Sequence, residues 1–112
     1  MKLKVLSAII TSRNDGASLG RCLDSLEDVG EVIVVDGMSS DDTVSVARSR
    51  RAVVYRRPMA DEIDQKNWAL GRARNRWVLS LTPDEVMTPG LRRAIECVED
   101  EPRWHGFVVH RT

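Results

Sequence analysis

The segment Glu31-Val32-Ile33-Val34-Val35-Asp36-Gly37 is the part of the chain that decides its fold class. Four consecutive β-branched residues, with no polar residue between them, predict a strand that is buried on both faces. Such strands occupy the centre of parallel sheets. An acidic residue and a glycine follow directly, and open α/β sheets bind ligands where their central strands end. The segment therefore predicts both a fold class and the place of a site.

Shorter apolar runs lie on both sides of this segment along the 112-residue chain. Their length and their content of β-branched and aromatic residues predict strands, since helices need longer periodic segments. The further strands that we expect cover residues 5–10, 52–55, 77–81 and 106–109.

Segments with helical periodicity separate these runs. The first carries four apolar residues between positions 19 and 26 on one helix face, and we expect Gly30 to end it in the left-handed conformation. Further helices are expected at residues 42–50, 61–73 and from the N-cap pair Thr88-Pro89 onward.

Strands and helices alternate along the chain, and such connections produce right-handed crossovers and a parallel sheet. The expected fold class is therefore α/β, with a mostly parallel sheet, flanking helices and a Rossmann-like arrangement. A chain of this length fits one domain, so we expect residues 1–112 to form a single domain.

Composition narrows the classes of function. The chain has 17 basic and 17 acidic residues, so its formal net charge is zero and nucleic acid is not an expected partner. No apolar stretch approaches the ~18 residues of a membrane helix, and no signal-peptide pattern is present. We therefore expect a cytoplasmic protein without a transmembrane segment, in which Cys22 and Cys97 are reduced, buried side chains.

Asp36 has two interpretations at this point. Its carboxylate can accept two hydrogen bonds from a ribose diol or from the edge of a base. It can equally bond the backbone of its own loop, while Ser39 and Asp42 form a capping box for the next helix. The spacing alone leaves both interpretations open.

The acids after the expected strand 77–81 also have two interpretations. Hard cations such as Mg²⁺ and Mn²⁺ prefer carboxylate oxygens and often share phosphate oxygens with a nucleotide, which suits Asp84. The run Thr82-Pro83-Asp84-Glu85 also fits a helix cap with proline at N1, and the local pattern favours the cap. Lys66 can similarly reach a phosphate, although an isolated helix lysine is more often solvated.

Four segments, in order, resemble the family 2 glycosyltransferases, in the branch that includes lipopolysaccharide-core glucosyltransferases. The first two are similar to the family's opening strand and turn and to its second strand and Asp-rich loop. The others are similar to the helix before the metal motif and to the strand that ends in D-x-D-E. In this chain the segments are SAIITSRND at 7–15, VIVVD with SSDDT at 32–43, QKNWAL at 65–70 and WVLSLTPDE at 77–85.

The resemblance implies a GT-A fold that binds a nucleoside-diphosphate sugar, with a UDP-sugar as the first expectation. It also implies that this chain corresponds to the nucleotide-sugar-binding half of the family. The residues that the resemblance assigns are Thr11, Arg13 and Asp15 around the nucleotide, Asp36 at the base or ribose, and Lys66 at the diphosphate.

By the same resemblance Asp84 is the acid linked to Mn²⁺ or Mg²⁺. Thr82 replaces the first acid of D-x-D, so we expect metal binding to be weak. Met38 stands where the family usually has glycine, and Thr11 stands where it often has proline. The family's second half carries the acceptor site and the base that deprotonates the acceptor, and the resemblance assigns that base to no residue of this chain.

Two hypotheses of function follow from the sequence. The first is a glycosyltransferase, or its sugar-nucleotide-binding half, acting on a saccharide or lipid-linked acceptor. The second is a non-catalytic binding module that keeps the fold without the chemistry. We also expect a homodimer or a partner chain to cover the edge of the last strand, because an open strand edge invites pairing.

Overall fold

The computed structural model describes residues 2–96 and 106–108, and strands and helices alternate as expected. In chain order the elements are η1 (Lys2–Val5), β1 (Leu6–Ser12), α1 (Gly16–Asp24), β2 (Glu31–Asp36), α2 (Thr43–Ser49), β3 (Val53–Arg56), α3 (Glu62–Leu70), β4 (Trp77–Leu81), α4 (Pro89–Glu96) and β5 (Gly106–Val108).

The strands form one sheet in the order β3-β2-β1-β4-β5, and every neighbouring pair is parallel. The expected α/β fold with a parallel sheet is therefore confirmed. The chain moves outward from β1 through β2 to β3, and then returns to the other side of β1 to add β4 and β5. The strand order thus reverses between β1 and β4, which is where sheets of this kind bind ligands.

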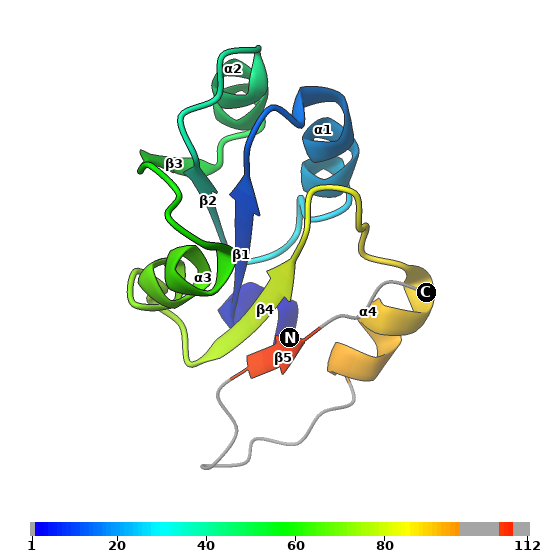
Figure 1. Cartoon of the computed structure of the whole chain (residues 1–112). Coiled ribbons are helices and arrows are strands. Elements are labelled where there is room, and N and C mark those ends of the chain that lie inside the picture. The colour runs from blue at the N-terminus through cyan, green and yellow to red at the C-terminus, as the bar shows by residue number, and fades with distance from the viewer. Residues whose placement is uncertain (1, 97–105, 109–112) are drawn as a thin grey trace.

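Helices cover both faces of the sheet. Helix α3 lies on one side, and α1 and α4 lie on the other (Figure 1). All seven residues of β1 are buried, so its side chains alternate between two cores. The larger core joins Ala8 and Ile10 to α1, α2 and α4, and the smaller one joins Ile9 to Ala69 of α3.

Gly30 does not have the conformation that the sequence predicted. Helix α1 ends at Asp24, and none of the glycines in the described part of the chain has a positive φ. A Cβ atom added to Gly30 would lie 2.1 Å from the carbonyl oxygen of Lys4. The position therefore needs glycine because two backbone segments approach closely there.

Two predicted caps are also wrong. Asp42 stands at the start of α2 without a side-chain cap bond, and Ser39 bonds Asp36 instead, so no capping box forms. The run that starts at Thr82 makes a turn and not a helix, because α4 begins only at Pro89. The predicted cap at Thr88 is confirmed, since its hydroxyl accepts the N–H of Leu91 at 3.1 Å.

Cys22 is buried in the larger core as a free thiol, as expected, whereas Cys97 lies outside the described residues. Burial, together with the nearby charges of Glu85 and Asp84, raises the pKa of Cys22 to about 12. The thiol is therefore protonated and unreactive at neutral pH. None of the helices in the described ranges is long and apolar enough to cross a bilayer.

Candidate functional site

A cleft of about 480 Å³ lies at the carboxyl ends of β1 and β4, at the point where the strand order reverses. Its walls come from the ends of both strands, the first turn of α1 and the segment around the start of α3. The lining residues are Thr11, Ser12, Arg13, Asp15, Ser18, Met59, Glu62, Thr82, Pro83 and Asp84.

The cleft brings together four of the residues that the family resemblance selected. Thr11 is buried at the end of β1, Arg13 and Asp15 follow on the loop to α1, and Asp84 approaches from the turn after β4. Asp36 and Lys66 are not among the lining residues. Three carboxylates and one guanidinium face this space, so its local charge is negative.

A larger groove, of about 960 Å³, lies near the amino ends of β2 and β3, away from the carboxyl ends of the strands. Ion pairs occupy its walls: Arg50 lies 3.0 Å from Asp24, and Arg74 lies 3.7 Å from Glu31. These pairs partly neutralise the basic residues near β3. The chemistry of the fold therefore favours the smaller cleft as the site.

Asp36 bonds its own loop, which was one of its two predicted interpretations. The carboxylate is fully buried. It accepts hydrogen bonds from the backbone N–H of Ser39 at 2.8 Å and from the Ser39 hydroxyl, and Arg56 Nε lies 3.4 Å from the same group. A buried charge of this kind needs such partners. The role of Asp36 toward a nucleotide stays a prediction.

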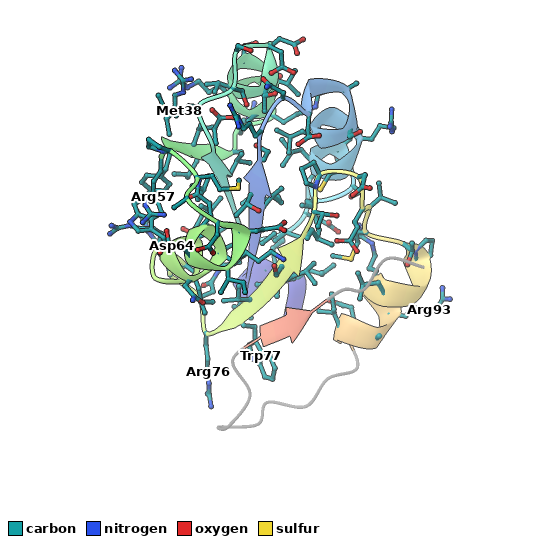
Figure 2. The ribbon with its side chains drawn as sticks, in the orientation of Figure 1. Met38, Arg57, Asp64, Arg76, Trp77 and Arg93 are labelled. Carbon is teal, nitrogen blue, oxygen red and sulfur yellow. The ribbon has the colours of Figure 1, made fainter. Side chains whose placement is uncertain are left out.

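In the loop after β2, the residue at position 38 has a backbone conformation that suits glycine, but this chain has methionine there. Met38 has a φ of 67° and its side chain is exposed (Figure 2). A left-handed φ carries a strain that glycine avoids. The departure at Met38 therefore leaves this residue in the left-handed conformation that a glycine would adopt without strain.

The turn after β4 holds Asp84 beside the cleft. Glu85 N–H donates to the carbonyl of Thr82 at 3.0 Å, and Thr82 N–H donates to Glu85 Oε1 at 2.7 Å. The Thr82 hydroxyl lies 2.6 Å from Asp84 Oδ1 and 3.0 Å from Glu85 Oε1. A hydroxyl has one proton, so it donates to only one of these carboxylates at a time.

The cleft offers few ligands to a divalent cation. No group of three or more His, Cys, Asp or Glu side chains that could hold a metal occurs within residues 2–96 and 106–108. Asp84 is exposed at the cleft, while Thr82 supplies a neutral hydroxyl where an acid would add charge. The residues fit only a cation that takes most of its ligands from a bound phosphate group and water.

Lys66 is half-buried on α3, outside the cleft. Gln65, which precedes Lys66 in α3, fixes the start of the helix, because its side-chain amide donates to the carbonyl of Arg57 at 2.8 Å. Arg57 in turn bonds Asp64 at 2.8 Å and Gln65 Oε1 at 2.7 Å; Figure 2 shows Arg57 and Asp64 on the same side of the molecule. This anchoring fixes where Lys66 leaves the helix.

Sequence reasoning missed several residues of the cleft wall. Ser12 lies at the end of β1 with a buried hydroxyl that has no partner in the described part of the chain. Glu62 begins α3 and belongs to the same wall. Ser12 is the last residue of β1 and Glu62 is the first residue of α3, and only the topology shows that they meet.

A parallel sheet with a ligand-sized cleft at its reversal point is the arrangement of open α/β domains that bind ligands at the carboxyl ends of their strands. The chain belongs to glycosyltransferase family 2, since residues 7–110 match the model of "Glycosyl transferase family 2". Its fold is that of the GT-A enzymes, and the family resemblance seen in the sequence is confirmed.

Two curated relatives illustrate the match. The chain is 35% identical over 97 residues to an uncharacterised glycosyltransferase of Rickettsia prowazekii. The alignment covers 86% of this chain and 33% of that protein. The chain is also 30% identical over 95 residues to the lipopolysaccharide core biosynthesis glycosyltransferase LpsC of Rhizobium meliloti, covering 80% of this chain and 35% of that protein. The chain thus spans about a third of the length of these relatives.

Solved structures show the same fold. Mannosyl-3-phosphoglycerate synthase from Rubrobacter xylanophilus matches with a TM-score of 0.65 and 28% identity, over 71% of this chain and 30% of that one. Staphylococcus aureus TarS, crystallised with UDP, matches with a TM-score of 0.67 and 24% identity, over 81% of this chain and 31% of that one. At that identity the second match speaks for the fold alone.

Proposed function

We propose that this chain is the nucleotide-sugar-binding part of a glycosyltransferase. The donor is a nucleoside-diphosphate sugar, in the first place a UDP-sugar, and the acceptor is a saccharide or a lipid-linked saccharide. The observation that carries the proposal is the cleft at the reversal of strand order, where Thr11, Arg13, Asp15 and Asp84 converge. Membership of the family supports it, and so does the relative named for lipopolysaccharide core biosynthesis.

Each residue has a proposed role. Thr11, Arg13 and Asp15 surround the nucleotide, and Asp84 holds a cation shared with the diphosphate. Asp36 serves the base or the ribose. Both of its oxygens are engaged by the loop, but a carboxylate oxygen has a second lone pair with which to accept a further hydrogen bond.

The negative charge of the cleft wall bears on the diphosphate. Asp15, Glu62 and Asp84 would repel a diphosphate, so its binding needs positive charge nearby. Arg13 is the basic side chain among the lining residues. Lys66 is proposed as a second cation that reaches over from α3 on its flexible four-carbon stem. Solved structures of the same fold contain UDP with Mn²⁺ or GDP-mannose with Mn²⁺, which makes both nucleotides the ligands to test.

A non-catalytic binding module is the second candidate. The observation that favours it is Thr82, a neutral residue at the position where the family carries an acid. This candidate binds the same nucleotide but transfers no sugar. A transfer or hydrolysis assay with UDP-sugars, run on the chain that binds UDP, separates it from the enzyme.

The binding test is calorimetric titration of UDP and GDP into the chain, with and without Mn²⁺. Arg13→Ala should weaken binding about tenfold, the effect of losing one charge-assisted hydrogen bond. Arg93→Ala is the matched control, because Arg93 is exposed on α4 and points into solvent (Figure 2). Absence of binding by the unmodified chain, or equal effects of the two variants, would overturn the proposed function.

A further inference from the structure

We propose that Ser39 and Asn14 are positioning residues of the nucleotide site, and that they fasten the loop carrying Arg13 and Asp15 to the buried carboxylate of Asp36. The proposal rests on the proposed function, because it concerns the same cleft. Neither Ser39 nor Asn14 lines the cleft. Their effect on a ligand is therefore exerted through the loop.

Ser39 is the central link. It is only 9% exposed, and its backbone N–H and its hydroxyl both donate to Asp36. The same hydroxyl oxygen accepts the backbone N–H of Asn14 at 2.8 Å. Because a hydroxyl donates one hydrogen bond and accepts others, Ser39 connects the end of β2 to the loop after β1.

Asn14 makes the second link between the two loops. Its side-chain oxygen accepts the N–H of Ser40 at 2.8 Å, and the next amide, that of Asp15, donates to the Thr43 hydroxyl at 3.1 Å. Asn14 has a φ of 54°, a conformation that asparagine tolerates better than most residues. Two consecutive amides of the loop after β1 are thus held, one by Ser39 of the loop after β2 and one by Thr43, the first residue of α2.

Arg56 closes this network on the far side. Its Nε lies 3.4 Å from Asp36 Oδ2, and its Nη2 donates to the carbonyl of Ser39 at 3.1 Å. Contacts with β3 therefore hold both Asp36, at the end of β2, and Ser39, the residue that contacts Asn14. A rigid support of this kind lowers the ordering cost that a ligand meets on binding.

The neighbours of Asn14 in the sequence show how this link affects the cleft. Arg13 and Asp15 flank Asn14 directly and both face the cleft. Residues on loops are placed only as accurately as the backbone that carries them. Without the Ser39 hydroxyl, the loop loses its attachment to a buried charge. It is then held through Asn14 Oδ1 and the Asp15 amide, so Arg13 and Asp15 are placed less accurately at the cleft.

The test compares three substitutions in the full chain by calorimetric titration of UDP and by amide hydrogen exchange measured with NMR. Ser39→Ala should weaken UDP binding about five- to tenfold, the effect of one lost hydrogen bond on a preformed site. It should also accelerate exchange of the Asn14 amide, which loses its acceptor. Ser39→Thr keeps the hydroxyl and should restore both quantities.

Ser45→Ala is the matched control, because it removes an exposed serine hydroxyl of α2 that donates to the carbonyl of Asp42 and not to Asn14. It should leave both quantities unchanged. Faster Asn14 exchange with unchanged UDP affinity in Ser39→Ala would overturn the positioning role, and so would failure of Ser39→Thr to rescue. Lack of UDP and GDP binding by the unmodified chain would overturn the proposed function itself, while the exchange rates would still measure the link between the loops.

Discussion

Asp36 and Asp84 are two acids at strand ends whose surroundings give them different tasks. Asp36 is fully buried, and its oxygens are engaged by Ser39 and Arg56. Asp84 is exposed at the cleft and contacts the hydroxyl of Thr82. A buried carboxylate is costly to leave without partners, whereas water solvates an exposed one. Their substitutions should therefore separate loop geometry from charge.

Asp36→Ala should weaken UDP binding at least tenfold, since each hydrogen bond to a charged group contributes about 1.5–3 kcal/mol. The chain should remain folded, which circular dichroism checks at the titration temperature. Asp24→Ala serves as the control, because it removes an exposed carboxylate that pairs with Arg50 away from the cleft. Unchanged UDP affinity combined with a lower melting temperature would make Asp36 a structural acid of the turn only.

Thr82 decides how strongly metal and nucleotide are coupled. With Asp84 as the one carboxylate assigned to the cation, UDP binding by the unmodified chain should depend only slightly on Mn²⁺ or Mg²⁺. Thr82→Asp should make binding clearly metal-dependent. The new carboxylate would face Asp84 and Glu85 in place of a hydroxyl that donates to one of them, so without a cation the variant should also melt at a lower temperature.

Thr82→Asn is the matched variant, because its amide can donate to the same carboxylates and adds no charge. Titration of UDP with chelator and then with excess Mn²⁺, together with melting curves under both conditions, tests all three chains. Strong metal dependence in the unmodified chain, or none gained in Thr82→Asp, would show that Asp84 does not hold the cation.

At the scale of elements, α4 is attached to the turn after α1 through one side chain. Arg92 donates to the Asp28 carboxylate and, at 3.1 Å, to the carbonyl of Ser25. The hydrogen bond from Arg92 lowers the pKa of Asp28 below its ordinary 3.8. Because the folded-state pKa is the lower one, the link contributes stability above about pH 4 and loses it as the pH falls through the folded-state value.

Asp28→Asn should therefore lower the free energy of unfolding at neutral pH, by less than about 1 kcal/mol because the pair is partly exposed and screened by solvent. The difference from the unmodified chain should shrink as the pH falls below 4. Urea unfolding from pH 7 to pH 2.5 measures it. Arg92→Met should remove the same pH-dependent part, and a difference that stays constant down to pH 2.5 would exclude the ion pair as its source.

Gly30 connects α1 to β2 where the backbone of Lys4 passes within contact distance. Gly30→Ala should destabilise the chain by about 1–3 kcal/mol, because a backbone carbonyl has to move to admit the methyl group. Gly71→Ala is the comparison: its φ is −67° and the nearest atom to its Cβ would lie 3.4 Å away. That variant should be neutral or slightly stabilising, and equal melting temperatures for the two variants would contradict the close approach.

Local pattern was enough for elements whose signal lies within the element. Strand β4 has the predicted bounds, because five apolar or small residues stand between arginines and a proline turn. The end of α1 was not predictable in this way, because glycine is required at position 30 by the close backbone of Lys4 and not by the end of the helix. The same reason explains the site: the contact of Asn14 with Ser39 joins residues 25 positions apart, and neither position carries a local signal for it.

At the scale of the whole molecule, the order of the strands decides which candidates meet. Four family-selected residues share one cleft because β1 and β4 are neighbours, although they are far apart in sequence. Asp36 stands one strand further along, and Lys66 lies on the helix that covers the other face of β1. The separate motifs do not show which of these residues line the cleft, because that depends on the order of the strands in the assembled sheet.

The sheet has β3 and β5 as its outer strands in the described part of the chain, and each presents an edge that another strand can pair with. We predict that the chain self-associates through β5, or pairs there with a partner chain. Light scattering over a range of concentrations should show a dimer of the isolated chain. Val108→Lys should return it to a monomer, because a lysine on an edge strand opposes pairing. Val53→Lys places the same charge on β3 and should leave the dimer intact, so it controls for charge alone. A chain that stays monomeric at high concentration, or a dimer that only Val53→Lys dissolves, would remove β5 as the interface.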